Sequence, residues 1–142
     1  MNSQKFVIGG IAGGIVSFLL GWVVYGMLLK DFMAANYSSL MRPDSETIWW
    51  SLSVGQLAFG FLLAYVIGKA NAASAGSGAA VGFVVGLISC LGIDFTMYGV
   101  STMLISVKGI IADVAATAVI SAIAGAVVGA VMGAGKKSVA MA

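Results

Sequence analysis

The chain has no histidine, one cysteine and one proline among its 142 residues. Zinc and haem sites are ordinarily built from histidine and cysteine, and Cys90 alone cannot supply such a ligand set. A single cysteine also excludes a disulfide within the chain. We therefore expect no metal centre of the histidine–cysteine type, no bound cofactor and no metal ligands.

Charged residues are scarce, at 8% of the chain against about 25% in soluble domains. Hydrophobic residues make up 61%, and the mean hydropathy is +1.08. Such a chain could not cover a folded domain with polar side chains, so we expect an integral membrane protein whose main partner is the lipid bilayer. The net charge of +2 is too small and too scattered for a nucleic-acid-binding surface.

Four apolar stretches are each long enough to cross a hydrocarbon core of about 30 Å. Polar or small residues separate them, and the only proline, Pro43, lies in the first connection. The pattern predicts an all-α fold, a polytopic transmembrane four-helix bundle, in a single domain over residues 1–142. The expected helices are 7–29, 48–68, 79–103 and 110–132.

Two connections carry specific expectations. Residues 30–47 are polar and are expected to be irregular, with Asp44 or Ser45 capping the helix that follows. Residues 71–78 are mostly small and are expected to form a flexible turn.

Lysine and arginine near the helix ends set the orientation of a membrane protein. With the N-terminus inside, four such residues lie inside and three outside. We therefore expect both termini on the cytoplasmic side of the cell (inner) membrane, and the near balance leaves open a dual-topology dimer. The inner residues are Lys5, Lys69, Lys136 and Lys137, and the outer ones are Lys30, Arg42 and Lys108.

Every expected helix has small residues at four-residue spacing, which places them on one face. This spacing lets helix backbones approach closely in lipid. The glycines gather toward the inner side, so we expect tight packing there and diverging helices around a polar pocket on the outer side. The glycines expected to pack helices together are Gly13, Gly21, Gly60, Gly82, Gly86, Gly125 and Gly129.

Two aspartates, Asp94 and Asp113, lie in apolar stretches on neighbouring expected helices and nearly equally far from the turn between them. An antiparallel hairpin would bring both to one depth. An aspartate at the centre of a membrane helix costs roughly 2.5–3.5 kcal/mol, so it usually faces the bundle interior or a wet cavity. Two close carboxylates repel, and one should hold a proton near neutral pH. We expect a polar pocket lined by Asp94, Asp113, Tyr25, Gln56 and Tyr98.

Each of these features also has a structural reading. Asp94 could hold helices together as a neutral acid, and Asp113 could be a helix-start residue favoured by the helix dipole. Cys90 is expected to be a small packing residue, since the chain has no histidine to activate its thiol. The glycine stripes are typical of plain helix packing.

A shift of 73 residues aligns the first expected helix with the third. Gly9 then meets Gly82, and Tyr25 meets Tyr98. This match predicts two hairpins in the same orientation, a parallel repeat.

The first expected helix contains Leu20-Gly21-Trp22-Val23-Val24-Tyr25, followed by Leu28, Leu29 and Phe32. On these residues the chain resembles a family of small four-helix bacterial integral membrane proteins of unknown function. That family has Gly-x-x-Trp-Tyr before a short apolar stretch, whereas two valines separate tryptophan and tyrosine here. The resemblance implies a four-helix layout and carries no activity and no site residues.

Two functions follow from these features. The first is a helix-packing module, acting as a homo-oligomer or as an accessory subunit with other membrane proteins. The second is a small proton- or cation-linked transporter or channel that uses Asp94 and Asp113. An enzyme is not expected, because the chain offers no activated nucleophile and only two intramembrane carboxylates for acid–base chemistry.

Overall fold

The computed structural model describes residues 2–37 and 42–135, and within them the fold is all-α, with no strand. One isolated bridge joins Tyr37 to Leu104. Residues 38–41 of the first connection lie outside the described residues, as do Lys136 and Lys137. The elements are α1 (Ser3–Val23), the π-helical turn η1 (Val24–Leu28), α2 (Lys30–Asn36), the 3₁₀ turn η2 (Asp44–Glu46), α3 (Trp49–Lys69), α4 (Ala75–Val100) and α5 (Val107–Gly133).

Four helices are long and apolar enough to cross a membrane: Ser3–Leu28, which joins α1 to η1, then α3, α4 and α5. α3 lies within one residue of its expected range. α5 has 27 residues, which at 1.5 Å per residue extend over about 40 Å.

Three helices begin earlier than expected because a polar side chain caps each first turn. α4 therefore includes half of residues 71–78, and the prediction of a flexible turn over that whole segment is wrong. The capping side chains and their donors are Asn2 with the amides of Gln4 and Lys5, Ser74 with the amide of Ser77, and Ser106 with the amide of Gly109.

The connection over residues 30–47 is not irregular throughout. The first long helix ends in the π turn η1, where the Leu29 amide donates to the Val24 carbonyl at 2.7 Å, and α2 follows directly. The predicted cap of α3 is also wrong: Ile48 precedes α3, and no side chain caps it. Asp44 instead begins η2 and pairs with Lys30.

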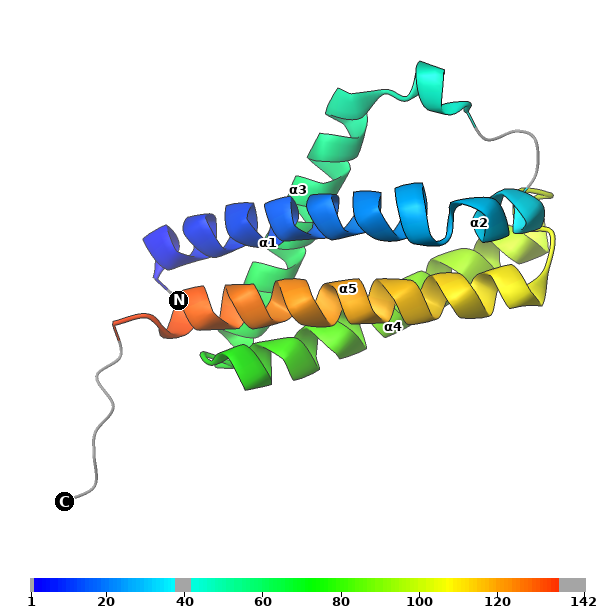
Figure 1. Ribbon diagram of the computed structural model, residues 1–142. Coiled ribbons are helices and arrows are strands. Elements are labelled where there is room, and N and C mark those ends of the chain that lie inside the picture. Colours follow the sequence, from blue (N-terminus) through cyan, green and yellow to red (C-terminus); the bar gives the residue numbers. More distant parts are fainter. Residues whose placement is uncertain (1, 38–41, 136–142) are drawn as a thin grey trace.

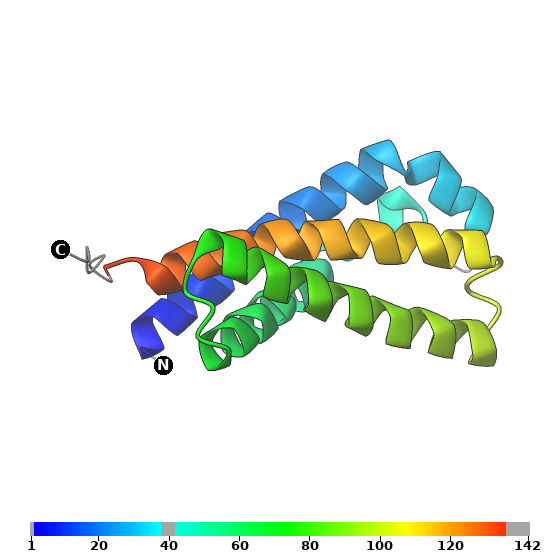
Figure 2. The ribbon, with the colours of Figure 1, turned by 90° about the horizontal axis from the view of Figure 1, so that it is seen from below.

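The long helices form two antiparallel pairs, α1 with α3 and α4 with α5, and α5 also packs against α1 (Figure 1). α1 and α4 run in the same direction, as the predicted repeat requires. The two pairs differ in shape, because α3 is inclined across α1 whereas α4 and α5 lie along each other. Figure 2 shows α1 and α4 diverging to opposite sides of α5 toward the end that carries α2.

α4 and α5 approach so closely that glycine is required at their contact. A Cβ built on Gly82 would overlap the carbonyl oxygen of Ser121, and one on Gly125 would overlap the carbonyl oxygen of Gly78. Gly129 meets the backbone of Ser74 in the same way. At Gly86 the obstacle is the Ser121 side chain.

α1 and α3 make a similar contact. A Cβ on Gly60 would overlap the backbone amide of Gly14, and one on Gly13 would lie 2.7 Å from a methyl group of Val128 and 3.5 Å from the Cα of Gly60. Beside this contact lies a core of fully buried residues: Leu63, Ala64, Ile67, Ala124 and Val128.

Gly21 does not pack against another helix, so the expectation for this glycine is wrong. Among the described residues, no atom of another helix lies within 4 Å of a Cβ built there. α3 begins at Trp49, whose ring packs on Phe18 with centroids 6.4 Å apart, and therefore no part of α3 reaches the next turn of α1.

At the glycine-packed end, the start of α1 is also joined to the end of α5. The Lys5 ammonium donates to the carbonyl oxygens of Met132, at 3.3 Å, and Ala134. These groups belong to the last turn of α5, where a cation offsets the negative end of the helix dipole.

Candidate functional site: a buried carboxylate cluster

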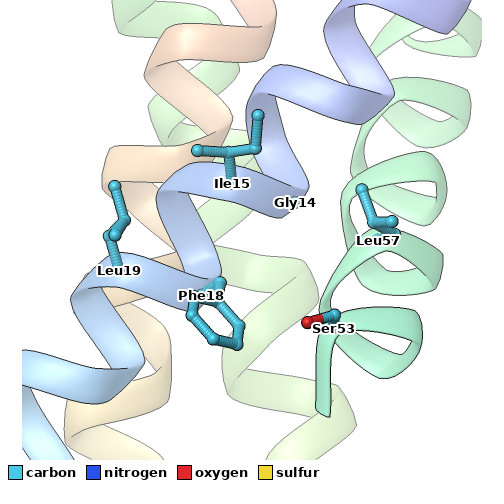
Figure 3. Close-up of a pocket in the computed structure, with 6 residues that line it drawn as sticks. All are labelled: Gly14, Ile15, Phe18, Leu19, Ser53 and Leu57. Carbon is cyan, nitrogen blue, oxygen red and sulfur yellow. The ribbon is translucent and has the colours of Figure 1, made fainter. Parts of the chain in front are cut away.

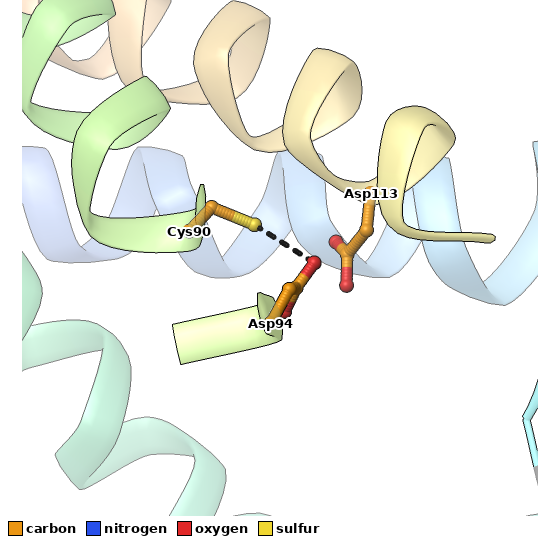
Figure 4. Close-up of side chains that lie close together, drawn as sticks. All are labelled: Cys90, Asp94 and Asp113. Atoms are coloured by element: carbon orange, nitrogen blue, oxygen red, sulfur yellow. Dashed lines mark hydrogen bonds between the residues drawn. The ribbon is translucent and has the colours of Figure 1, made fainter. Parts of the chain in front are cut away.

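Asp94 and Asp113 lie at the same level of the α4–α5 pair. Asp94 precedes the end of α4 at Val100 by six residues, and Asp113 follows the start of α5 at Val107 by six. Each carboxylate therefore lies about 9 Å along its helix from the shared turn. Their side chains converge between the two helices, together with Cys90 from the preceding turn of α4 (Figure 4).

The three side chains bring their ligating atoms close together. A carboxylate oxygen of each aspartate and the Cys90 sulfur all lie within 4.8 Å of one another. The thiol donates to Asp94 Oδ2 at 3.5 Å. Asp94 is 6% exposed and Cys90 8%, whereas Asp113 is half-buried.

Hydroxyl donors surround Asp113. Tyr25, in the π turn η1, donates to Oδ1, and Tyr37, at the end of α2, donates to Oδ2. Thr117, one turn along α5, lies 2.9 Å from the Tyr25 hydroxyl and 3.4 Å from Asp113 Oδ1. The site thus joins η1, α2, α4 and α5. Hydrogen bonds to an ionised carboxylate are stronger than those between neutral groups.

The α4–α5 turn holds Tyr37 in place. The Ile105 amide donates to the Asn36 carbonyl at 2.8 Å, and the Ser106 hydroxyl donates to the Asn36 side chain. Burial and the hydrogen bond to Asp113 both raise the pKa of the Tyr37 hydroxyl. Tyr37 therefore keeps its proton and remains a donor to the carboxylate across the physiological pH range.

The two carboxylates lack a basic partner. Within residues 2–37 and 42–135 the ion pair is Lys30 with Asp44, and no lysine or arginine lies within ion-pair distance of Asp94 or Asp113. The tyrosines stabilise negative charge on Asp113, while the donor to Asp94 is a thiol. A buried charge without compensation is costly, so Asp94 needs a proton or a cation.

Two buried serines lie between the carboxylate cluster and the glycine contacts of the helices. Ser121 follows Thr117 by one turn of α5, and Ser17 precedes Tyr25 by two turns of α1. Both are fully buried, and neither hydroxyl has a hydrogen-bond partner among the described residues. The close glycine contacts between α4 and α5 begin at Ser121, whose carbonyl oxygen faces Gly82.

Two of the five residues expected in the pocket lie elsewhere. Tyr98 lies one turn beyond Asp94, close to the end of α4; it is 42% exposed, and no hydrogen bond joins it to either aspartate in the described residues. Gln56 lies where α3 crosses α1: a Cβ on Gly14 would be 3.0 Å from its carbonyl oxygen, and no hydrogen bond joins it to either aspartate. The inclination of α3, which spacing in the sequence does not predict, separates Gln56 from the cluster.

Tyr37, Thr117 and Cys90 belong to the site and were not among its expected residues. Four-residue spacing from the aspartates places Cys90 and Thr117 on the faces that meet, so these two could have been found. Tyr37 has no comparable signal, because its position depends on η1 and α2.

An apolar pocket lies apart from the carboxylates, between α1 and α3 (Figure 3). A second one lies between α3 and α4. No titratable side chain lines either of them. The residues that line the first pocket are Gly14, Ile15, Phe18, Leu19, Ser53 and Leu57.

Comparisons with protein-family models, with curated proteins and with solved structures found no match. The resemblance of residues 20–25 to a small bacterial membrane protein family therefore stays a prediction.

Proposed function

We propose that this chain is a multi-pass integral membrane protein that binds a proton or a small cation between Asp94 and Asp113, as a small ion-linked transporter or channel. One observation carries the proposal. Two carboxylates from neighbouring apolar helices meet in a buried cluster, without a basic partner in the described residues.

The surface supports the membrane part of the proposal. Large apolar side chains are exposed on all four long helices, as lipid-facing residues would be. Trp22 is 51% exposed and precedes Tyr25 by three residues, so it lies at the end of the first long helix that carries the site. Tryptophan favours the membrane–water interface, so this end would lie close to one surface of the bilayer.

The cluster itself supports ion binding. Intramembrane aspartates usually mark ion or proton pathways, because the fold gains little from burying an unpaired charge. Asp113 already has two phenol donors, so its charge is stabilised. Asp94 has a thiol donor alone, which is too weak to support a second buried charge. A proton or cation at Asp94 completes the charge balance.

A second candidate is the helix-packing module, as a homo-oligomer or an accessory subunit of a membrane assembly. Gly92 and Gly99 favour it, because no atom of another helix within residues 2–37 and 42–135 lies within 4 Å of a Cβ built on either. They are seven residues apart, about two turns, and so lie on one face of α4 that another helix could approach closely. Asp94 would then be a structural group.

We expect both termini to be cytoplasmic, because four of the seven basic residues flank that side. In a Cys90→Ser background, a cysteine at Ser138, outside the described residues, should resist an impermeant thiol reagent in intact cells. A cysteine at the exposed Ser45 should react. Equal labelling at both positions would instead indicate dual topology.

Asp94→Asn should fold normally and lose proton- or cation-driven transport, because the amide keeps the shape of the carboxyl and can neither ionise nor release a proton. The measurement is flux into liposomes with an internal pH dye, under an imposed pH or cation gradient. Asp31→Asn, at an exposed acid on α2, is the matched control and should behave like the wild type. Unchanged flux in the Asp94→Asn variant would contradict the transport proposal and leave the helix-packing module as the remaining candidate function.

A further inference from the structure

We infer that the cluster binds a thiophilic divalent transition-metal ion of the zinc class, through the Cys90 sulfur and a carboxylate oxygen each from Asp94 and Asp113. The inference rests on the proposed function and names the class of cation. It departs from the expectation of no metal ligands, which was based on the lack of histidine and the single cysteine.

The distances fit such an ion. Zinc bonds to sulfur at about 2.3 Å and to carboxylate oxygen at about 2.0–2.2 Å in tetrahedral geometry, which puts sulfur and oxygen about 3.6 Å apart. Cys90 Sγ and Asp94 Oδ2 are 3.5 Å apart. The third ligand atom, from Asp113, lies within 4.8 Å of both.

The buried Asp94 carboxylate points to a ligand independently of the count of acidic groups. It is 6% exposed, its Oδ1 has no donor in the described residues, and Figure 4 shows it directed into the space between α4 and α5. Asp113 Oδ1 accepts hydrogen bonds from Tyr25 and Thr117, whereas Oδ2 accepts one from Tyr37 and keeps a second lone pair free for a metal. Such outer hydrogen bonds typically orient ligating carboxylates.

The donor set selects the metal. A thiolate favours zinc, cadmium and cobalt over magnesium and calcium, which prefer sites made of oxygen alone. Three protein ligands leave the fourth position of a tetrahedron to water. An ion held in this way can exchange, as a transported ion must.

The charges balance without a redox step. A divalent ion forms bonds to the Cys90 thiolate and both carboxylates, while the thiol and the Asp94 carboxyl each release a proton to the solvent. The site thus exchanges one divalent cation for about two protons, with no change in net charge.

Cobalt titration of the full chain in detergent tests this inference. Co²⁺ should bind with 1:1 stoichiometry, give a sulfur-to-cobalt charge-transfer band and release about two protons in weakly buffered solution. Zn²⁺ should displace it, and Mg²⁺ should not. Cys90→Ser should lose the band and bind at least about 10-fold more weakly, and Asp31→Asn should match the wild type.

The outcomes separate this inference from the proposed function. A wild type without the band, or a Cys90→Ser variant with unchanged Co²⁺ affinity, would overturn the metal inference. If Asp94-dependent flux persisted in that case, the site would serve protons or alkali cations. If the wild type shows neither the Co²⁺ charge-transfer band nor Asp94-dependent flux, both the metal inference and the proposed transport function are overturned. Cys90→Ala provides a second variant, with thermal stability as the check that each protein is folded.

Discussion

Gly82→Leu should separate α4 from α5 and lower the free energy of unfolding by at least about 1–3 kcal/mol, the usual cost of overpacking. That range describes sites where neighbouring side chains can shift. At Gly82 the obstacle is the carbonyl oxygen of Ser121, and the Cα of Gly125 lies only 3.0 Å from the added Cβ. The helices would have to move apart. Equilibrium unfolding in mixed detergent, followed by tryptophan fluorescence, measures the loss.

Gly92→Leu provides the matched control on the same helix. In the part of the chain that the structure describes, no other helix has an atom within 4 Å of a Cβ at Gly92. Leucine has a helix propensity better than that of glycine by somewhat less than 1 kcal/mol. This variant should be as stable as the wild type or slightly more stable. Equal losses at the two positions would show that leucine disturbs α4 for a reason other than its contact with α5.

Asp113→Val should lower the free energy of unfolding by about 1–2 kcal/mol, the upper end of the range for hydrogen bonds between membrane helices. Valine is similar in size to aspartate and accepts no hydrogen bond. The Tyr37 hydroxyl would lose its acceptor, whereas Tyr25 would keep Thr117. The same unfolding experiment measures the effect.

A double-mutant cycle identifies the cause of this loss. Tyr37→Phe removes the stranded hydroxyl, so adding it to Asp113→Val should cost less than Tyr37→Phe costs in the wild type. Asp31→Val is the surface control and should stay within about 0.5 kcal/mol of the wild type. Additive effects of the two substitutions would mean that Tyr37 and Asp113 do not interact in the folded protein.

Helix content could be predicted from the sequence because it depends on local signals. Apolar length indicates the four long helices, and four-residue spacing indicates which glycines share a face. Asp94 and Asp113 could be paired because equal distances from a short turn determine the depth of both. These inferences require only that neighbouring helices are antiparallel.

The unpredicted features depend on contacts between distant segments. The π turn η1 and the break at Leu29 redirect the chain into α2, and only then can Tyr37 reach Asp113. The inclination of α3 decides that Gln56 lies against Gly14 and that Gly21 faces no helix. Neither the turn nor the inclination follows from the hydrophobic pattern, since both are set by how four side-chain surfaces fit together.

The glycine contacts between α4 and α5 limit how an ion bound at Asp94 could cross the bilayer. Between Gly78, Gly82, Gly125 and Gly129 there is no room even for a methyl group, so a file of water molecules cannot follow the α4–α5 seam there. Net passage of an ion along this seam would require the two helices to part at their most tightly packed point.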